Sequence, residues 1–172
     1  MLGGDVVQSE GGDALTALEI SERLTFVGLD CNTREDVISA LAERLEIYGL
    51  VLPSYRQAVL DREREMPTGL LTKAGCVAIP HTDCEHVVRS AIAVALLEHP
   101  VVFKSMAAPE DDLPVIAVLQ LAVADKKHIV SLLANLANMF LDPEILGGLL
   151  TKTSPADVVS YLGRTLSLPA SS

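Results

Sequence analysis

The stretch with the clearest chemical potential is GCVAIPHTDCEH at residues 75–86, where a short apolar run ends at Pro80-His81. A histidine directly after a buried strand lies where ligands of α/β sheets tend to bind, beyond the carboxyl ends of the strands. Pro80 fixes its own φ and lacks an amide donor, so it stiffens the backbone that carries the ring. The strand would supply rigidity and the loop would supply access, which makes His81 the first candidate for a catalytic residue.

An imidazole in this position can act as a nucleophile. One ring nitrogen can attack while the other donates a hydrogen bond that fixes the tautomer. Attack on phosphorus would give a phosphohistidine that carries roughly −1.5 to −2 charges, by analogy with other phosphorylated residues. Hydrogen-bond donors would then have to surround His81.

Three other side chains could supply those donors. His128 lies near the start of a helix that begins around Lys126, where unpaired amides and the helix dipole favour a bound anion. Arg62, in the segment LDRERE, has a planar guanidinium that fits phosphoryl oxygens. Thr68 offers a hydroxyl on the turn that leads to the His81 strand. These residues could form a phosphate pocket around His81.

Each of these candidates also has an ordinary structural explanation. Arg62 could form an ion pair with Glu63 or Glu65, which are its neighbours in the sequence. Thr68 could be a turn former, and His128 could lie on the surface of its helix. The sequence alone leaves these alternatives open.

Two other chemistries could use the same loop. A metal site could combine His81 and His86 with Asp83 or Cys84, but the i to i+5 spacing of the histidines matches no common structural zinc pattern. A cysteine–histidine hydrolase could use Cys84 and His81, but residues three positions apart in one turn rarely place a base in line with a thiolate. Phosphoryl chemistry at His81 is the better interpretation.

Apolar runs predict the strands that would position these side chains. Residues 75–79, 90–97 and 114–124 form nearly continuous apolar runs, and TFVGL at 25–29 has the composition of a shorter strand. Continuous runs of this kind are typical of strands that are buried on both faces of a sheet. We therefore expect a sheet that helices cover on both sides.

Helical patterns alternate with these strands. They span residues 32–50, Ser54 to about Glu65, 126–141, 142–150 and 154–164, with Thr33, Ser54, Asp142 and Ser154 as candidate N-caps and Gly49 as a helix stop. This order predicts an α/β fold, a single-domain sandwich with a mixed central β-sheet flanked by helices on both faces. We divide the chain into a flexible tail at 1–14, this domain at 15–166 and a C-terminal tail at 167–172.

The composition narrows the possible partners. The chain has 172 residues and a formal net charge of −10, which argues against nucleic acid or anionic lipid, because both bind basic patches. No signal-peptide pattern opens the sequence, and the longest apolar stretch, 113–124, falls short of the roughly 20 residues that a spanning helix needs. The 3 cysteines lack CxxC spacing and suit reduced thiols. We expect a soluble cytoplasmic protein without direct membrane insertion.

Taken together, these residues resemble the EIIA proteins of the fructose/mannitol class in the bacterial phosphoenolpyruvate-dependent sugar phosphotransferase system. The resemblance covers about residues 16–164 and is carried by REREMPTGLLTKAGCVAIPHTDCEHVVRSAIAVALLEHPVVF and LAVADKKHIVSLLANLANMFLDPEILGGLLTKTSPADVVSYL. The PTGL turn, the longer TKAG segment and the HTDCEHV continuation are most similar to the galactitol-type subgroup. Thr82 departs from the common pattern, which has glycine at this position.

The resemblance implies a role for each candidate residue. His81 would be the phosphorylated nucleophile and His128 the second active-site histidine, while Arg62 and Thr68 would line the phosphate pocket. The phosphoryl group would arrive from the histidine of HPr and leave for a cysteine of EIIB, which serves the EIIC permease. The resemblance thus implies a phosphotransferase that relays from His to His to Cys, without metal or cofactor, for galactitol or a related sugar or polyol. The alternative is a regulatory EIIA-like protein, in which the phosphorylation state of His81 controls binding to other proteins.

Overall fold

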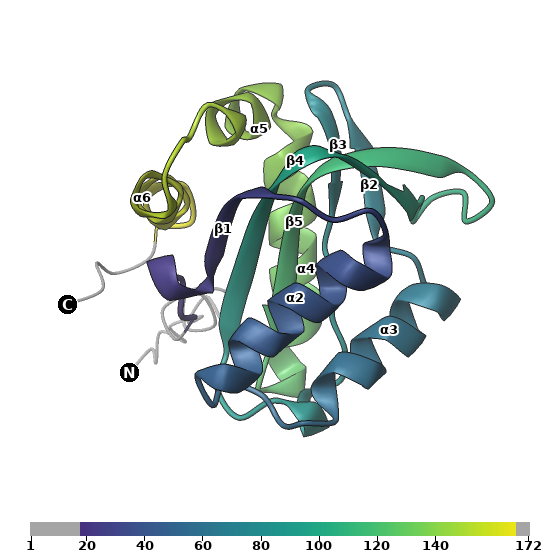
Figure 1. Ribbon diagram of the computed structural model, residues 1–172, viewed down its shortest axis with the longest axis vertical. Helices are drawn as coiled ribbons and strands as arrows, with labels where there is room; N and C mark the ends of the chain where they lie inside the picture. Colours follow the sequence, from purple (N-terminus) through teal and green to yellow (C-terminus); the bar gives the residue numbers. More distant parts are fainter. Residues whose placement is uncertain (1–17, 168–172) are drawn as a thin grey trace, which may run out of the picture.

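The computed structural model describes residues 18–167, which form an open five-stranded sheet with helices on both faces (Figure 1). The strands are β1 (Thr25–Leu29), β2 (Gly69–Thr72), β3 (Gly75–Ala78), β4 (Ala91–Lys104) and β5 (Asp112–Ala122). Their spatial order is β1-β4-β5-β3-β2, and the β1–β4 and β3–β5 pairs are parallel while the other pairs are antiparallel. The predicted α/β class with a mixed sheet is confirmed. The predicted tails, residues 1–14 and 167–172, lie outside the described residues except for Ser167.

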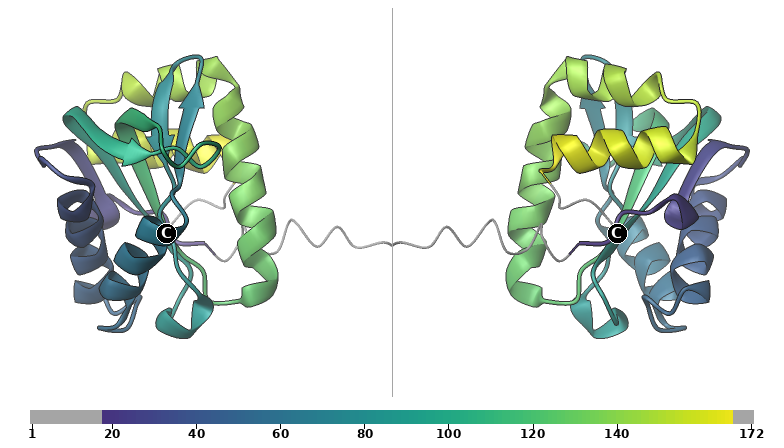
Figure 2. Two further views of the ribbon diagram at one scale, coloured as in Figure 1. Left: turned by 90° about the vertical axis from the view of Figure 1, so that its right-hand side faces the viewer. Right: turned by 90° about the vertical axis from the view of Figure 1, so that its left-hand side faces the viewer.

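The helices form one layer on each side of the sheet (Figure 2). They are α2 (Arg34–Ile47), α3 (Tyr55–Glu65), α4 (Lys126–Leu141), α5 (Pro143–Leu150) and α6 (Pro155–Thr165), with the short 3₁₀ turns η1 (Glu22–Leu24) and η2 (Cys84–His86). Side chains of α2 and α3 pack with one face of the sheet, and those of α4, α5 and α6 pack with the other. Consecutive residues of β5 show this division, because Val118 belongs to the first core and Leu119 to the second. The prediction that both faces of the sheet are covered is confirmed.

Local hydrogen bonds explain most of the helix ends. Three of the predicted N-caps are confirmed, because each side chain accepts a hydrogen bond from a backbone amide in the first turn of its helix. The pairs are Thr33 with the Asp36 amide, Asp142 with the Glu144 amide and Ser154 with the Asp157 amide. Gly49 ends the first helix with a φ of +68°, a conformation that suits glycine.

The predicted cap at Ser54 is wrong. Ser54 precedes α3, but its side chain makes no capping hydrogen bond and its backbone is already helical. Its hydroxyl lies 2.8 Å from Nδ1 of His86 instead. The hydroxyl therefore joins the start of α3 to the η2 turn, and the helical backbone of Ser54 differs from the extended conformation of a capping residue.

Strand β2 was not predicted, because the residues around Pro67 and Gly69 carry turn chemistry. In the structure β2 forms a hairpin with β3 in which Gly69 pairs with Ala78. A Cβ atom on Gly69 would collide with the backbone carbonyl of Lys104. The glycine therefore allows the end of β4 to approach β2 closely. Strand β2 has only four residues, too few to show an alternation of apolar and polar side chains.

Strand β4 extends beyond its predicted end at residue 97 and runs to Lys104. The register with β5 shifts between Leu96 and Val101, and the intervening residue Pro100 has no amide to donate. The irregularity accommodates this proline, so that the strand continues after it.

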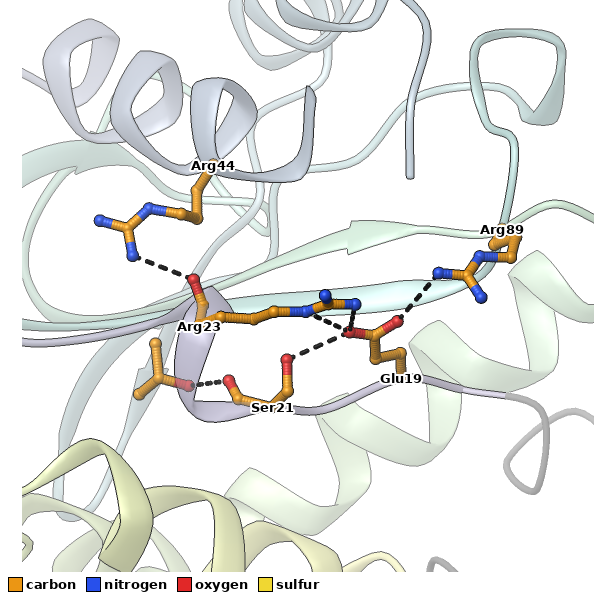
Figure 3. A network of polar contacts seen from close by, with 6 residues as sticks. Glu19, Ser21, Arg23, Arg44 and Arg89 are labelled. Atoms are coloured by element: carbon orange, nitrogen blue, oxygen red, sulfur yellow. Dashed lines mark hydrogen bonds and ion pairs between the residues drawn. The ribbon is translucent and has the colours of Figure 1, made fainter. Parts of the chain in front are cut away.

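The segment before β1 is hydrogen-bonded to the start of β4, and Figure 3 shows the contacts of the Glu19 side chain in this segment. The Glu19 amide donates to the Ser90 carbonyl, and the Ile92 amide donates to the Glu19 carbonyl. The Glu19 carboxylate accepts from Arg23 at 2.8 Å and lies 3.5 Å from a guanidinium nitrogen of Arg89. These contacts hold the segment around Glu19 against the start of β4, the strand that follows the His81 loop.

No single helix within residues 18–167 is long and apolar enough to cross a membrane, although α4 and α5, which meet at a bend of 85°, have the required length and composition as a pair.

Candidate functional site

His81 lies where two parallel strands end at the same edge of the sheet. It follows β3 through Ile79 and Pro80, and it forms an isolated parallel bridge with Leu121 of β5. The Leu121 amide donates to the Pro80 carbonyl at 2.9 Å. This is the position that the sequence predicted. The predicted access is narrower than expected, because only 7% of the residue is exposed.

Both ring nitrogens of His81 have hydrogen-bond partners. Nδ1 lies 2.9 Å from the Ile79 carbonyl oxygen, and Nε2 lies 3.1 Å from Nε of Arg62. Because a guanidinium can only donate, Nε2 must carry a lone pair and Nδ1 must carry the proton. The two contacts therefore select one tautomer, in which Nδ1 carries the proton and Nε2 carries the lone pair.

The surroundings also favour the neutral form of this ring. Burial lowers the pKa of His81, and the positive charge of Arg62 lowers it further. The hydrogen bond to the Ile79 carbonyl and the charge of Asp83 act in the opposite direction, but the net shift of the pKa is downward. The ring is therefore neutral, and available as a nucleophile, at pH 7.

Helix α3 brings Arg62 to the ring. Tyr55, Val59 and Glu63 recur every fourth residue and form the buried side of α3. The Tyr55 hydroxyl donates to the Leu121 carbonyl at 2.7 Å, so the helix is anchored to the same residue that bridges to His81. Among the described residues Arg62 forms no ion pair, and the ordinary explanation that it pairs with a neighbouring glutamate is therefore wrong.

Thr68 makes its hydrogen bonds to Glu63 and Ile79 and none to the His81 ring. Its amide donates to Oε1 of Glu63 at 3.0 Å and its hydroxyl donates to Oε2 at 2.8 Å. The same hydroxyl oxygen accepts from the Ile79 amide at 3.2 Å. The Thr68 hydroxyl thus has its proton engaged with Glu63, and its oxygen supports the residue whose carbonyl contacts Nδ1 of His81.

Sequence reasoning gave Glu63 no role beyond a possible ion pair with Arg62. Its side chain is buried, with 2% of the residue exposed, and burial raises its pKa to about 7 against the opposing hydrogen bonds from Thr68. The available signal was its spacing from Tyr55 and Val59, which places it on the buried side of α3. Asp61 and Glu65 lie close to Glu63 on the same helix, so the sequence did not single out Glu63 as the buried acid.

His128 lies in the first turn of α4, at the end of the molecule where the η2 turn also lies (Figure 2). Its amide donates to the Asp125 carbonyl, and its Nδ1 is 3.8 Å from the Asp125 carboxylate. Asp125 also accepts from the Lys127 amide, so an acidic side chain already occupies part of the predicted anion site. No hydrogen bond within residues 18–167 joins His128 to His81. The structure thus brings Arg62 into contact with His81 and connects Thr68 to the ring only through Ile79. His128 lies at the same edge of the sheet but has no contact with His81 through a hydrogen bond in the described residues.

The geometry gives no support to the two other chemistries. His86 uses its ring nitrogens for Ser54 and Glu85, and no group of His, Cys, Asp or Glu within residues 18–167 is arranged to hold a metal ion. Within residues 18–167 no hydrogen bond joins Cys84 to His81, whose ring nitrogens contact Arg62 and Ile79.

The chain matches one family model over residues 19–164, that of the phosphoenolpyruvate-dependent sugar phosphotransferase system, EIIA 2. Among curated relatives, it is 28% identical over 137 residues to the galactitol-specific EIIA component of Escherichia coli strain K12, which covers 80% of this chain and 87% of that protein.

Two solved structures from Escherichia coli resemble the fold. The crystal structure of the mannitol IIA has a TM-score of 0.68 and 28% identity, and the match covers 84% of this chain and 99% of that chain. The complex of enzyme IIAMTL and phosphorylated enzyme IIBMTL has a TM-score of 0.68 and 25% identity, with 87% and 98% covered.

Proposed function

Because the chain belongs to the EIIA 2 family of the phosphoenolpyruvate-dependent sugar phosphotransferase system, we propose that Nε2 of His81 accepts a phosphoryl group from HPr and passes it to a cysteine of an EIIB component. The observation that carries this proposal is the selected tautomer of His81. The Ile79 carbonyl accepts from Nδ1 and keeps the proton there, and the Arg62 guanidinium donates to Nε2.

The transfer is an in-line displacement at phosphorus. The Nε2 lone pair forms the new N–P bond while the P–N bond to the donor histidine breaks, and the electron pair of that bond stays with the donor nitrogen. His81 keeps its Nδ1 proton, so the phosphorylated ring is cationic and its N–P bond is easily broken again. When the cysteine thiolate of EIIB attacks phosphorus, the electron pair returns to Nε2. No proton has to move on His81 in either direction.

Arg62 has two successive tasks in this scheme. In the unphosphorylated protein its Nε–H occupies the lone pair of Nε2, so the guanidinium must move aside before attack. Its side chain is only half-buried and can make this movement. The guanidinium can then donate to phosphoryl oxygens, for which its planar geometry is suited. Thr68 contributes to the phosphate pocket through its support of Ile79, because its own hydroxyl is engaged with Glu63.

His128 is the second histidine of the proposed site. From the first turn of α4 it can approach a phosphoryl group on Nε2 from the side opposite α3, since β5 leads directly from the His81 bridge to this helix. A role in onward donation predicts that His128→Ala retains acceptance from HPr while transfer to EIIB slows. Unchanged rates in both directions would remove His128 from the site.

The relatives support the choice of partners and sugar class. The similarity to a galactitol-specific EIIA component favours galactitol or a related sugar or polyol. The enzyme IIAMTL–IIBMTL complex supports an EIIB protein as the acceptor, which would in turn serve an EIIC permease.

The decisive experiment is phosphorylation with radiolabelled phosphoenolpyruvate, enzyme I and HPr, followed by addition of candidate EIIB proteins. The proposal expects one acid-labile, base-stable phosphoryl group that leaves for EIIB. The His81→Ala variant should stay unlabelled, whereas His99→Ala, which changes an exposed histidine, should be labelled normally. Label on His81→Ala would refute the assignment. Labelling of His81 without transfer to any EIIB would favour the regulatory alternative.

A further inference from the structure

We propose that Glu63 is a positioning residue for His81, because its buried carboxylate holds Thr68 and, through Thr68 and Ile79, fixes the orientation and the tautomer of the ring. This inference rests on the proposed function, in which Nε2 of His81 accepts the phosphoryl group. It adds a residue that touches neither the phosphoryl group nor the histidine.

A continuous series of hydrogen bonds connects the two side chains. Thr68 donates to Glu63 twice, with the amide 3.0 Å from Oε1 and the hydroxyl 2.8 Å from Oε2. The hydroxyl oxygen accepts from the Ile79 amide at 3.2 Å, and the Ile79 carbonyl accepts from Nδ1 of His81 at 2.9 Å. Ile79 therefore connects the threonine to the histidine through its own two backbone groups.

The series requires an acceptor at both carboxylate oxygens of Glu63. The Thr68 oxygen already accepts from Ile79, so its own proton is directed to Glu63. An amide group at position 63 would present an N–H donor toward this hydroxyl, and the hydroxyl proton would lose its acceptor. A buried hydroxyl without an acceptor is unfavourable, so the Thr68 side chain would turn and release the Ile79 amide.

The burial of this acid has no other evident cause. Among the described residues Glu63 forms no ion pair, and both of its oxygens are used by Thr68. Arg34 and Glu35 of α2 are the charged groups that face it from the neighbouring helix, and their influences on its pKa oppose each other. Because packing of α3 on the sheet needs no carboxylate, a costly buried acid indicates a specific task.

Helix α3 thereby controls both nitrogens of the catalytic ring. Arg62 contacts Nε2 directly, and its neighbour Glu63 acts on Nδ1 through Thr68 and Ile79. A shift of α3 would alter both contacts together. The adjacent arginine and glutamate are therefore a unit that presents the nucleophile and fixes its protonation.

The test compares four variants of the full chain. Glu63→Gln and Thr68→Val break the series, Thr68→Ser keeps the hydroxyl, and Glu65→Gln changes an exposed acid two residues away on the same helix. We measure the rate of phosphoryl acceptance from phosphorylated HPr and the ¹⁵N NMR shifts of the His81 ring, which report the tautomer. Thermal unfolding of each variant is recorded in parallel.

Glu63→Gln and Thr68→Val should accept phosphate at least about tenfold more slowly, and their rings should populate the tautomer with the proton on Nε2. Glu65→Gln should match the wild type in rate and tautomer, and Thr68→Ser, which keeps the hydroxyl, should keep the wild-type tautomer. The double variant of Glu63→Gln with Thr68→Val should be no slower than either single variant, because both break the same series.

Two results would overturn the inference. The first is a wild-type tautomer and rate in Glu63→Gln. The second is a slower rate with an unchanged tautomer and lower thermal stability, which would give Glu63 a purely structural role. Failure of the proposed function looks different, because the wild-type protein would then not be labelled on His81. In that case the NMR measurement would still decide whether Glu63 sets the tautomer.

Discussion

Arg62 influences His81 in two separable ways, as a hydrogen-bond donor to Nε2 and as a positive charge. The charge lowers the pKa of the ring, so Arg62→Gln should raise the pKa of His81 relative to the wild type, as an NMR titration would measure. The variant should also accept phosphate at least about tenfold more slowly, because a neutral amide stabilises the charge on the phosphoryl group less than a guanidinium does. A pKa that does not move would show that Arg62 is absent from the ring in solution.

Glu63 should make stability depend on pH in a direction unusual for an acid. Its pKa is raised from 4.5 to about 7, so the folded protein binds a proton that the unfolded chain has released over this range. The resulting stabilisation is present at low pH and is lost as the pH rises toward 7. Relative to Glu63→Gln, the wild-type free energy of unfolding should fall by about 3 kcal/mol between pH 4.5 and pH 8.

Urea unfolding of both proteins at several pH values measures this difference. The lowered pKa of His81 has the opposite effect, because stability is lost when the pH falls below about 6.5 and the unfolded chain binds the proton more readily. The pKa of His81 is therefore measured by NMR in both proteins, and its contribution is subtracted before the remaining difference is assigned to Glu63. A difference that stays constant with pH would mean that Glu63 is not buried in solution.

At the scale of elements, the sequence predicted most of what positions the site. The helix at 126–141 was predicted with the bounds that α4 has, and the strand before His81 was located within one residue of the end of β3. Strong periodicity and continuous apolar runs explain these successes. Strand β2 was missed because its four residues follow a proline and carry no pattern, and its place is set by pairing with β3 and by contact with the end of β4.

The candidate site was predictable only in part, for a related reason. Residue type and position relative to a strand end were sufficient to select His81, and guanidinium chemistry was sufficient to select Arg62. The choice of Glu63 over Glu65 depends on which side of α3 faces the sheet, and the anchor that sets this, Tyr55, lies two turns earlier. Nor could the sequence show that the Thr68 hydroxyl would be used internally.

The anchoring of α3 can be tested with Tyr55→Phe. The variant removes the hydroxyl that donates to the Leu121 carbonyl and leaves that buried acceptor without this partner, which should lower the free energy of unfolding by about 1–3 kcal/mol. Phosphoryl acceptance should fall less than about threefold, because the other residues of the buried side still hold the helix. Tyr48→Phe, at an exposed tyrosine, should change stability by less than about 0.5 kcal/mol. Equal effects of the two variants would contradict an anchoring role for Tyr55.

At the scale of the whole molecule, the net charge of −10 bears on how phosphoryl donors arrive. An acidic protein attracts a partner with a basic face, and the attraction raises the association rate more than the final affinity. Added salt screens this attraction, since the Debye length falls from about 10 Å at 0.1 M to about 3 Å at 1 M. The rate of phosphoryl acceptance from limiting HPr should therefore fall as salt is raised.

The position of the charges provides the control for this prediction. Asp83 is exposed, lies two residues after His81 and influences the pKa of that histidine. Glu110 is also exposed, but it lies just before β5, at the end of the strand opposite to the His81 bridge. Asp83→Asn should lower the association rate at low salt by about twofold or more, and Glu110→Gln should have a smaller effect although it removes the same charge. The two variants should become equal near 1 M salt, because screening then removes the contribution of either carboxylate. A rate that is insensitive to salt, or an equal loss in both variants at low salt, would mean that local charge near His81 does not guide the donor.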